Sequence, residues 1–482
     1  MLMLNDMHFS EFQGLLYKKF VPLDTAFQFS YHKVVPVCGW CMLKLGSTRI
    51  LAARMASLAP GQRYDLVVFG ATGFTGQYVV EEVARVAQKE KERKTPLTWA
   101  IAGRSEKKLQ SSLVEARNEL GLSLDDVGII LADVKDNESL KEMASKSTVV
   151  INCVGPYQLY GEPVIQACLE KGASHVDISG EPQFLEGMQA KYNKAAEEAG
   201  VHIVGACGYD SIPAEMGLVH MIKNFKGELN SAEMFVRTKS SKTTSIHTGT
   251  MESAALAVAN RGEIARIRRE LFPIPLPKPK HKVKKKGVLH KNEELGLWGV
   301  PLPTDEPVVY RTQRYRHDVL GQRPLQFQQF LGVRKFFQGF GLLLGMAYFS
   351  FLCFFSWTRN LLLKYPEVLT AGVFSRAGSD RESLKGLRFT ATLIGRGWSD
   401  SLLQGSDQHT EPPNASIKVK ISGPDPGYGA TSLMMVASAM TILREKHSIP
   451  GKGGVLTPGV AFMDTDLIKR MVDQGMTVEV VE

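Results

Sequence analysis

Three evenly spaced glycines near residue 70 could bind a phosphate. Gly70, Gly73 and Gly76 end the segment YDLVVFGATGFTG (64–76), whose apolar run 66–69 is typical of a strand buried on both faces of a parallel sheet. A helix pattern follows, so free N–H groups and the positive end of the helix dipole would meet a phosphate there. In a dinucleotide fold these glycines allow the tight turn, the approach of the pyrophosphate and close helix packing.

The residues that would contact the ribose and the adenine follow the next two expected strands. The strand 97–102 is followed by Arg104, and the strand 127–132 by Asp133. An arginine at the first position suits the 2′-phosphate of NADP, whereas an acid would bind the 2′-hydroxyl of NAD. A solvated loop charge is the alternative for Arg104. The pattern therefore favours NADP (NADPH) over NAD, with Asp133 placed to meet the adenine edge.

The predicted cofactor contacts also include the loop after the fourth strand, 148–154, which ends in Gly155. Ligands of such folds bind at this carboxyl edge of the sheet. The full predicted set is Gly70, Thr72, Gly73, Phe74, Thr75, Gly76, Arg104, Asp133 and Gly155.

Hydride transfer also needs a proton donor. Tyr157 and Asp210 are the first choices, because each is expected in a loop directly after a buried strand. Asp210 could instead cap the helix expected near Pro213, and Tyr157 could simply pack. No YxxxK arrangement supports either, since Gly161 lies four residues after Tyr157. The other candidate donors are Tyr160, Glu181, Tyr209 and His247.

The elements that must position these residues alternate as strand and helix. Six strands linked by helices predict an α/β fold with a Rossmann-type, doubly wound parallel sheet. Their expected ranges are 66–69, 97–102, 127–132, 148–154, 174–178 and 201–206. A chain of 482 residues is too long for one core of usual size, so further domains are expected.

Beyond residue 213 the pattern changes to that of a second α+β domain. The predicted organisation is an N-terminal extension (1–63), a dinucleotide-binding domain (64–213), a second domain (214–422) and a C-terminal part returning to the first (423–482). Met55 is expected to be the usual start, which would leave residues 1–54 outside the native protein.

Two segments of the second domain suggest a lipid surface. Six lysines lie between 278 and 286, in the loop 273–287, which is either an exposed flexible loop or a contact for acidic lipid. The segment 338–357 contains twenty residues without a charge, with basic residues on both sides. It could span a bilayer, form a hairpin or an interfacial helix, or lie in a protein core. Membrane or lipid-droplet association is the prediction.

Net charge and cysteine content indicate which binding partners and which compartment to expect. The net charge of +9 would suit nucleic acid or an anionic membrane, and the absence of a nucleic-acid motif favours the membrane. Six cysteines are few for this length and indicate a reducing compartment. Cys38 and Cys41 form a CxxC without a second pair, which we interpret as coincidence, so no metal site is predicted.

From Tyr64 to the C-terminus the chain resembles the saccharopine dehydrogenase-like oxidoreductases of animals. The resemblance rests on VVFGATGFTG (67–76), AGRS (102–105), NCVGPYQLYGEPV (152–164), DISGEPQF (177–184), GYDSIPAE (208–215), GPDPGYGAT (423–431) and GGVLTPG (453–459). It implies a Rossmann domain for NAD(P), an inserted second domain, and kinship with saccharopine dehydrogenases and bacterial trans-acting enoyl reductases. It also implies association with lipid droplets and membranes.

The expected function is an NAD(P)-dependent oxidation or reduction of a lipid-type substrate at a membrane or lipid-droplet surface. Saccharopine carries three carboxylates, and the loops at the strand ends show no matching cluster of Arg and Lys. The alternatives are an inactive lipid-droplet or membrane protein that keeps the dinucleotide fold, and a mitochondrial location.

Overall fold

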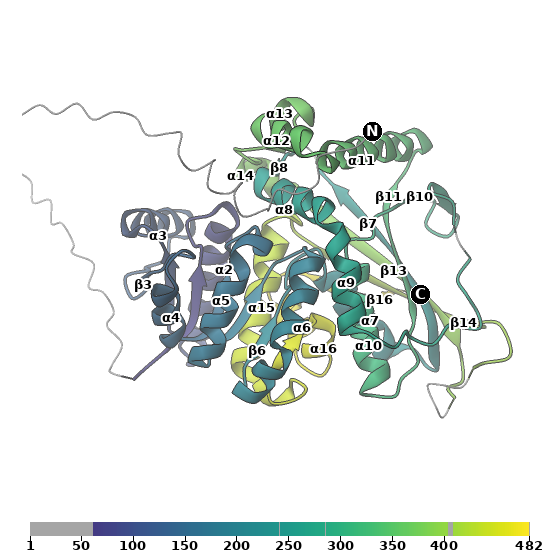
Figure 1. Ribbon diagram of the computed structural model, residues 1–482, viewed down its shortest axis with the longest axis horizontal. Helices are drawn as coiled ribbons and strands as arrows, with labels where there is room; N and C mark the ends of the chain where they lie inside the picture. Colours follow the sequence, from purple (N-terminus) through teal and green to yellow (C-terminus); the bar gives the residue numbers. More distant parts are fainter. Residues whose placement is uncertain (1–60, 241, 285, 403–407, 482) are drawn as a thin grey trace, which may run out of the picture. The chain divides into compact units, whose positions relative to one another are not determined.

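The computed structural model describes residues 61–482 apart from 241, 285, 403–407 and 482. In this part of the chain a parallel sheet has the strand order β15-β6-β5-β4-β1-β2-β3 (Figure 1). Its strands are β1 (Tyr64–Phe69), β2 (Trp99–Gly103), β3 (Gly128–Leu131), β4 (Ser147–Asn152), β5 (Ser174–Asp177), β6 (His202–Val204) and β15 (Gly454–Leu456). The predicted Rossmann-type sheet is confirmed, and β15 extends it beyond the six expected strands.

Strand β1 lies inside this sheet, between β4 and β2, and both of its faces are apolar. Leu66 and Val68 pack into one buried cluster, and Val67 and Phe69 pack into another. Successive side chains of a strand point to opposite faces, so a continuous apolar run needs a helix layer on each side. The helices that connect the strands are α2 (Phe74–Glu92), α3 (Glu106–Leu120), α4 (Asn137–Ser145), α5 (Tyr157–Lys171) and α6 (Pro182–Ala199).

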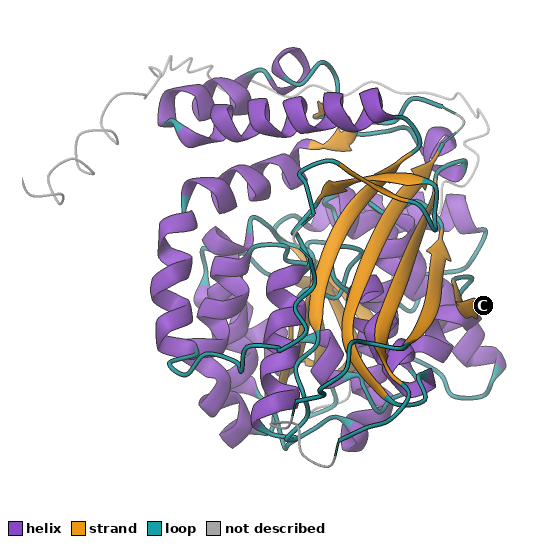
Figure 2. Cartoon of the chain, turned by 90° about the vertical axis from the view of Figure 1, so that its right-hand side faces the viewer, coloured by secondary structure: helices purple, strands orange, loops and turns teal. Residues whose placement is uncertain are grey.

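The second sheet has the order β16-β14-β13-β7-β11-β10-β9, and β7 pairs in parallel only with β11. In Figure 2 its strands face the viewer and helices lie behind them. The chain enters this sheet through α7 (Ile212–Asn224), where Gly217 lies against Leu393 and Ile421. The strands are β7 (Glu228–Lys239), β9 (His290–Asn292), β10 (Leu297–Pro301), β11 (Gln326–Val333), β13 (Arg388–Trp398), β14 (Ala415–Gly423) and β16 (Thr477–Val481).

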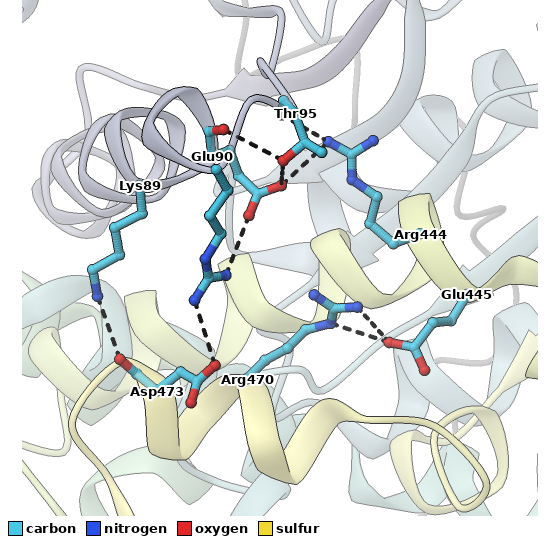
Figure 3. Close-up of polar contacts among 8 residues, drawn as sticks. Lys89, Glu90, Thr95, Arg444, Glu445, Arg470 and Asp473 are labelled. Carbon is cyan, nitrogen blue, oxygen red and sulfur yellow. Dashed lines mark hydrogen bonds and ion pairs between the residues drawn. The ribbon is translucent and has the colours of Figure 1, made fainter.

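The C-terminal segment serves both sheets. Helix α15 (Gly429–Glu445) packs against α2, and β15 pairs with β6, whereas the last strand, β16, pairs with β14 of the second sheet. Ion pairs fix this return (Figure 3): Glu90 of α2 contacts Arg444 at 3.4 Å, and Arg93 contacts Asp473 of α17 (Leu467–Asp473) at 3.7 Å. The segment 423–482 thus contributes α15 and β15 to the first sheet and β16 to the second.

A group of helices gathers at one edge of the second sheet (Figure 1). A small core of Met251, Ala255, Leu352, Cys353 and Leu362 joins three of them, α8, α11 and α12. The helices that gather there are α8 (Thr248–Ala259), α11 (Phe336–Phe354), α12 (Ser356–Lys364), α13 (Pro366–Leu369) and α14 (Arg381–Lys385). Helix α9 (Arg261–Leu271) packs against α6, and α10 (Glu306–Asp318) packs against β11 and α7. The short strands β8 (Ile246–His247) and β12 (Phe374–Ser375) pair beside them.

Helix α11 carries most of the apolar segment 338–357 and is largely exposed. Among the described residues it is one helix whose length and hydropathy would allow it to cross a membrane, and only 17% of its apolar window is buried. The interpretation as a core helix is therefore wrong. The basic loop 273–287 contains no helix or strand over its described residues and lies against the second sheet, where the His281 carbonyl accepts hydrogen bonds from Asn230 and Gln326.

Candidate functional site

The glycine turn after β1 has the close contacts that a phosphate-binding turn requires. Gly70 has φ +83°, and a Cβ there would lie 2.7 Å from Cγ2 of Val154. A Cβ at Gly76 would lie 2.1 Å from the Gly70 carbonyl oxygen, so only glycine lets α2 begin this close to the strand. Gly73 is exposed at the helix N-cap. These contacts are those of a tight turn at Gly70 and close helix packing at Gly76, while the approach of a pyrophosphate at Gly73 stays a prediction.

The first turn of α2 leaves its N–H groups available to a ligand. Gly73 supplies no capping side chain, and the turn contains no acid. The Gln77 N–H donates to the Gly73 carbonyl, which leaves the amides of Phe74, Thr75 and Gly76 ahead of the first intrahelical bond. Uncapped N–H groups with the helix dipole behind them favour an anion. The residues present therefore fit the pyrophosphate of a dinucleotide.

Arg104 and Asp133 follow the ends of β2 and β3, the two strands on one side of β1. Arg104 follows β2 and is exposed, and its guanidinium makes no hydrogen bond or ion pair with any residue that the structure describes. Ser105, beside it, caps α3 by accepting the Lys108 N–H. Asp133 is half-exposed, and its carboxylate accepts the Lys135 N–H at 3.0 Å. Arg104 is thus available to a 2′-phosphate, while Asp133 shapes a local turn.

An aromatic cluster covers the outer side of the glycine turn. The Phe74 ring stacks on His247 at 4.7 Å and meets the edge of Tyr428 at 4.7 Å. The His247 N–H donates to the Tyr428 hydroxyl at 3.0 Å, and Tyr78 stacks on Tyr428 at 5.3 Å. This cluster joins α2, the start of α8 and the motif 423–431. The Phe74 ring therefore packs on protein, which leaves its backbone amide as the group for a ligand.

Tyr157 does not lie in the expected loop. Helix α5 begins at Tyr157, after Pro156, which follows Gly155 through a cis peptide bond. The Tyr157 side chain is buried, and its hydroxyl donates to the Asn152 carbonyl at 2.9 Å. Burial raises the pKa of this hydroxyl well above its usual value. The prediction of a loop position is wrong, and the geometry favours a packing role over proton donation.

Glu181, another candidate donor, acts as a junction between elements. Its carboxylate accepts the N–H groups of Tyr157 and Gln158, both at 2.9 Å, and so stabilises the positive end of α5. The Ser253 hydroxyl of α8 donates to the same carboxylate at 2.8 Å. The buried Glu181 carboxylate thus accepts three hydrogen bonds and links the end of β5 to α5 and α8.

Asp210 lies in the loop between β6 and α7. Helix α7 begins at Ile212 with Ser211 at its N-cap, so Asp210 does not have the capping role considered from the sequence. The residue is exposed, and a Cβ at Gly180 would lie 3.3 Å from its Oδ2. The protein packed around the carboxyl raises its pKa, although the residue keeps contact with solvent. The carboxyl is thus both reachable and inclined to hold a proton.

A second carboxyl lies close to Asp210. Asp305 is buried and receives hydrogen bonds from Thr304 Oγ1 at 3.0 Å and Gln329 Nε2 at 3.0 Å. Burial, and then the negative charge of Asp210, raise the pKa of Asp305 well above its usual value. Asp305 is the N-cap residue of α10 and belongs to no recognisable sequence motif, which is why it was not predicted.

The ends of β5 and β6 are held by a buried carboxyl that the sequence did not single out. Asp177 Oδ1 accepts the N–H groups of Ser179 at 2.9 Å and Ala206 at 3.1 Å. Burial raises the pKa of Asp177 to about 7 and lowers the pKa of the neighbouring His175 to about 3. Asp177, the first residue of the motif DISGEPQF, was the sequence signal that could have identified this carboxyl. Its role is to fix the loops that carry Gly180 and Asp210.

A groove lies away from the glycine turn, in the second domain. This groove of about 780 Å³ lies between α10, β11 and the loop 273–287, and it shares no lining residue with the glycine turn. Within the described residues no group of three or more His, Cys, Asp and Glu side chains is placed to hold a metal ion. Cys38 and Cys41 lie outside the residues that the structure describes, as do residues 1–54.

Comparisons with known proteins agree with this geometry. Residues 66–204 match the family described as saccharopine dehydrogenase NADP binding domain. A human saccharopine dehydrogenase-like oxidoreductase is 42% identical over 88% of this chain and 99% of its own. A lipid droplet localized protein from Caenorhabditis elegans is 36% identical over 86% and 97%.

Among solved structures, the apo form of saccharopine dehydrogenase (L-Glu forming) from Saccharomyces cerevisiae covers 86% of this chain and 99% of its own, with 12% identity and a TM-score of 0.48. The identity to the human relative extends through both sheets and the helices at their edge. The chain belongs to the saccharopine dehydrogenase-like oxidoreductases, a family with an NADP-binding domain.

Proposed function

We propose that this chain is an NADPH-dependent oxidoreductase that reduces a carbonyl or enoyl group of a lipid-type substrate at a membrane or lipid-droplet surface. The observation that carries the proposal is the turn of Gly70, Gly73 and Gly76, whose contacts fit a pyrophosphate, with the unpaired Arg104 at the end of the adjacent strand. The name of the Caenorhabditis elegans relative supports the lipid surface.

The cofactor would be held by the backbone rather than by side-chain charges. The amides of Phe74, Thr75 and Gly76 would bind the pyrophosphate, and the Arg104 guanidinium would bind the 2′-phosphate that distinguishes NADPH from NADH. Thr72 and Gly155 border this crevice at the ends of β1 and β4. Tyr157 and Glu181 fix the start of α5 beside Gly155 and are positioning residues.

A bound NADPH supplies the hydride, and the protein must supply the proton. We assign the proton to the Asp210 carboxyl, which reaches solvent and has a raised pKa. Asp210 gives its proton to the substrate atom that becomes electron-rich as the hydride arrives, is left as a carboxylate, and recovers a proton from water. Gly180, beside the carboxyl, leaves space for that substrate atom.

A lipid-type substrate is supported by the position of α8. Its first residues and His247, before it, border the glycine turn, and Ser253 contacts Glu181. Met251 and Ala255 on the same helix pack against α11, whose other faces are apolar and exposed. One helix of twelve residues thus connects the dinucleotide crevice to an apolar surface, which is the arrangement that an enzyme with a membrane-borne substrate needs.

The first experiment tests the cofactor. Arg104→Ala should weaken NADPH binding about tenfold or more and leave NADH binding nearly unchanged, because only NADPH carries the 2′-phosphate. Binding is measured by the fluorescence of the reduced nicotinamide. Lys107→Ala, an exposed charge one turn away on α3, is the matched control and should change neither affinity. Equal losses for the two cofactors in Arg104→Ala would remove the assignment.

The second experiment tests catalysis. NADPH consumption should appear when lipid extract is added to the full chain, and Asp210→Asn should abolish it while NADPH still binds. Binding without turnover for any lipid fraction, unaffected by Asp210→Asn, would instead favour the inactive dinucleotide-binding protein that keeps the fold. Turnover with saccharopine and NADP would show a third activity and contradict the lipid substrate.

A further inference from the structure

The helices α11, α12 and α13 present an apolar face that the described protein does not cover. Phe337 is 83% exposed, Val368 78% and Trp357 68%, and Leu344 and Phe351 are more than half exposed. These side chains come from three consecutive helices at one edge of the molecule (Figure 1). Contiguous exposed apolar residues on this scale mark a surface that contacts another phase or another protein.

Helix α11 is fastened to the protein at both ends. Near its start Gly339 is buried, and a Cβ there would lie 2.6 Å from Leu289 Cδ1. Near its end Leu352 and Cys353 fill the small core with Met251 and Ala255 of α8. At 1.5 Å per residue these attachments lie about 21 Å apart along the axis. A helix held at two points this far apart runs along the protein surface and does not project from it.

Side chains of α12 donate hydrogen bonds to backbone carbonyls at the end of α11. The Thr358 hydroxyl of α12 donates to the Leu352 carbonyl at 2.7 Å and to the Phe355 carbonyl at 2.9 Å, and Arg359 donates to the Cys353 carbonyl at 3.0 Å. Helix α12 then packs beside α11. A spanning helix would place Arg359 across the bilayer from the start of α11 and free of the protein, whereas here Arg359 and α12 fold back onto the end of α11.

Bases outnumber acids around this face. Residues 334–369 contain Arg334, Lys335, Arg359 and Lys364 and one acid, Glu367, which pairs with Arg376 at 3.5 Å. Arg261 adds a guanidinium 5.0 Å from the centre of the Phe354 ring. A second copy of the same face would bring like charges together, so self-association is disfavoured. Anionic lipid headgroups complement these bases, and Trp357 and Tyr365 are side chains typical of the headgroup level.

We infer that α11–α13 form an in-plane docking surface, in which α11 lies parallel to a single phospholipid leaflet with anionic headgroups and does not cross it. This inference rests on the lipid-surface part of the proposed function. A surface of this kind needs only one leaflet. It therefore binds the phospholipid monolayer over an oil droplet as well as a bilayer, whereas a spanning helix requires two headgroup layers about 30 Å apart across a hydrocarbon core.

The test compares the two lipid surfaces. The purified full chain is floated with phosphatidylcholine–phosphatidylserine vesicles and with triacylglycerol droplets coated by the same phospholipids. Binding to both is expected, with a loss of about tenfold when phosphatidylserine is omitted or when salt is raised to 0.5 M, because surface charges are then unmatched or screened. Binding to vesicles without binding to droplets would overturn the in-plane geometry, and so would binding that ignores both charge and salt.

Two double variants connect the result to this face. Phe337→Glu/Trp357→Glu should lower binding to both lipid surfaces at least tenfold, because both side chains are exposed and their replacement costs no core packing. Val472→Glu/Val480→Glu, at comparably apolar exposed positions on α17 and β16, should bind as the wild type does. Equal loss in both variants, or none in the first, would refute the assignment. A wild-type dimer that the first variant disrupts would assign the face to a second copy instead.

Turnover separates this inference from the proposed function. NADPH consumption with detergent-dispersed lipid does not require docking, so Phe337→Glu/Trp357→Glu should retain it while losing flotation. Flotation that is intact in a chain without NADPH turnover overturns the catalytic proposal and leaves the docking surface standing. Turnover that is intact with no flotation of the wild-type chain overturns the docking surface alone.

Discussion

At the end of β6, the proton of the Asp210 carboxyl is the ionisable feature on which the proposed chemistry depends. The carboxyl has a raised pKa, so it keeps its proton at pH values where an ordinary aspartic acid has lost it. Its acid form is needed for reduction. The turnover number should therefore be level on the acidic side and fall about tenfold per pH unit once Asp210 ionises.

Asp210→Asn should lower the turnover number by about 10²–10⁴-fold and remove this pH dependence, as measured by steady-state NADPH oxidation. The comparison is Tyr157→Phe, which removes a hydroxyl bonded to the Asn152 carbonyl and should cost roughly 1 kcal/mol of stability with little change in turnover. The reverse ranking of the two variants would restore Tyr157 as the donor.

Gly76 supplies a residue-scale prediction about the cofactor turn. In Gly76→Ala the new Cβ would lie 2.1 Å from the Gly70 carbonyl oxygen, so the turn must open. We expect a loss of about 1–3 kcal/mol in the free energy of unfolding and at least tenfold weaker NADPH binding. Gly262→Ala is the matched helical control, because a Cβ there has open space around it. Urea unfolding and NADPH titration of both variants measure the difference.

At the scale of elements, the contact between α7 and α10 contains a buried carboxyl. Glu215 of α7 is buried and accepts a hydrogen bond from the Thr312 hydroxyl of α10. Burial raises its pKa from 4.5 to about 7. Because the folded state binds this proton more tightly, the stability that it contributes is present below pH 4.5 and is lost as the pH rises through 7.

Glu215→Gln should therefore flatten the pH dependence of stability. Relative to the variant, the wild type should lose roughly 3 kcal/mol in the free energy of unfolding between pH 4.5 and 7, from 1.36 kcal/mol per pKa unit. Asp177 has a pKa of about 7 and titrates in the same range, so the wild type will keep part of its slope in either case. Urea unfolding at a series of pH values measures both chains, and parallel curves would contradict the role of Glu215.

For α11, the sequence predicts the helix but not what surrounds it. Its length and lack of charge predicted a helix over 338–357, and the structure has one at Phe336–Phe354. Whether such a helix spans, lies flat or fills a core depends on its neighbours. Leu352 and Cys353 lie in a small core with α8, so deleting the segment would remove core packing as well as lipid contact. Substitution of its exposed residues is therefore the sharper test.

At the scale of the whole molecule, the two sheets are joined by a chain that passes between them more than once. The chain leaves the first sheet through α7, returns to it as β15, and ends in the second sheet as β16. Glu90–Arg444 and Arg93–Asp473 add contacts between α2 and the returning segment (Figure 3). Neither sheet is complete without residues that follow the other.

The two sheets should therefore unfold together. We expect a single calorimetric transition, with circular dichroism and tryptophan fluorescence giving the same midpoint. NADPH at 100 times its dissociation constant should stabilise the whole transition by about 2.7 kcal/mol, although it contacts only the first sheet. Two resolved transitions, of which NADPH shifts one, would show that the sheets are independent.

Local residue patterns were enough to predict the elements that depend on neighbouring residues. The apolar run of β1, the three glycines after it and the alternation of strands and helices predicted the parallel sheet and the tight turn after β1. These features are set by residues within a few positions of each other, since a strand buried on two faces must be apolar throughout and a tight turn needs glycine. Arg104 and Asp210 followed from the rule that ligands meet the carboxyl ends of strands.

The tertiary structure decided which side chains are available to act there. Tyr157 and Asp210 were equivalent candidates in the sequence, but their surroundings in the fold differ. The Tyr157 hydroxyl donates to the Asn152 carbonyl and its backbone N–H donates to Glu181, whereas Asp210 stays exposed. Asp305, brought beside Asp210 from far along the chain, could not be found from local pattern. Burial and pKa depend on everything that packs around a group, so the environment of the site is a property of the folded molecule and not of any one segment.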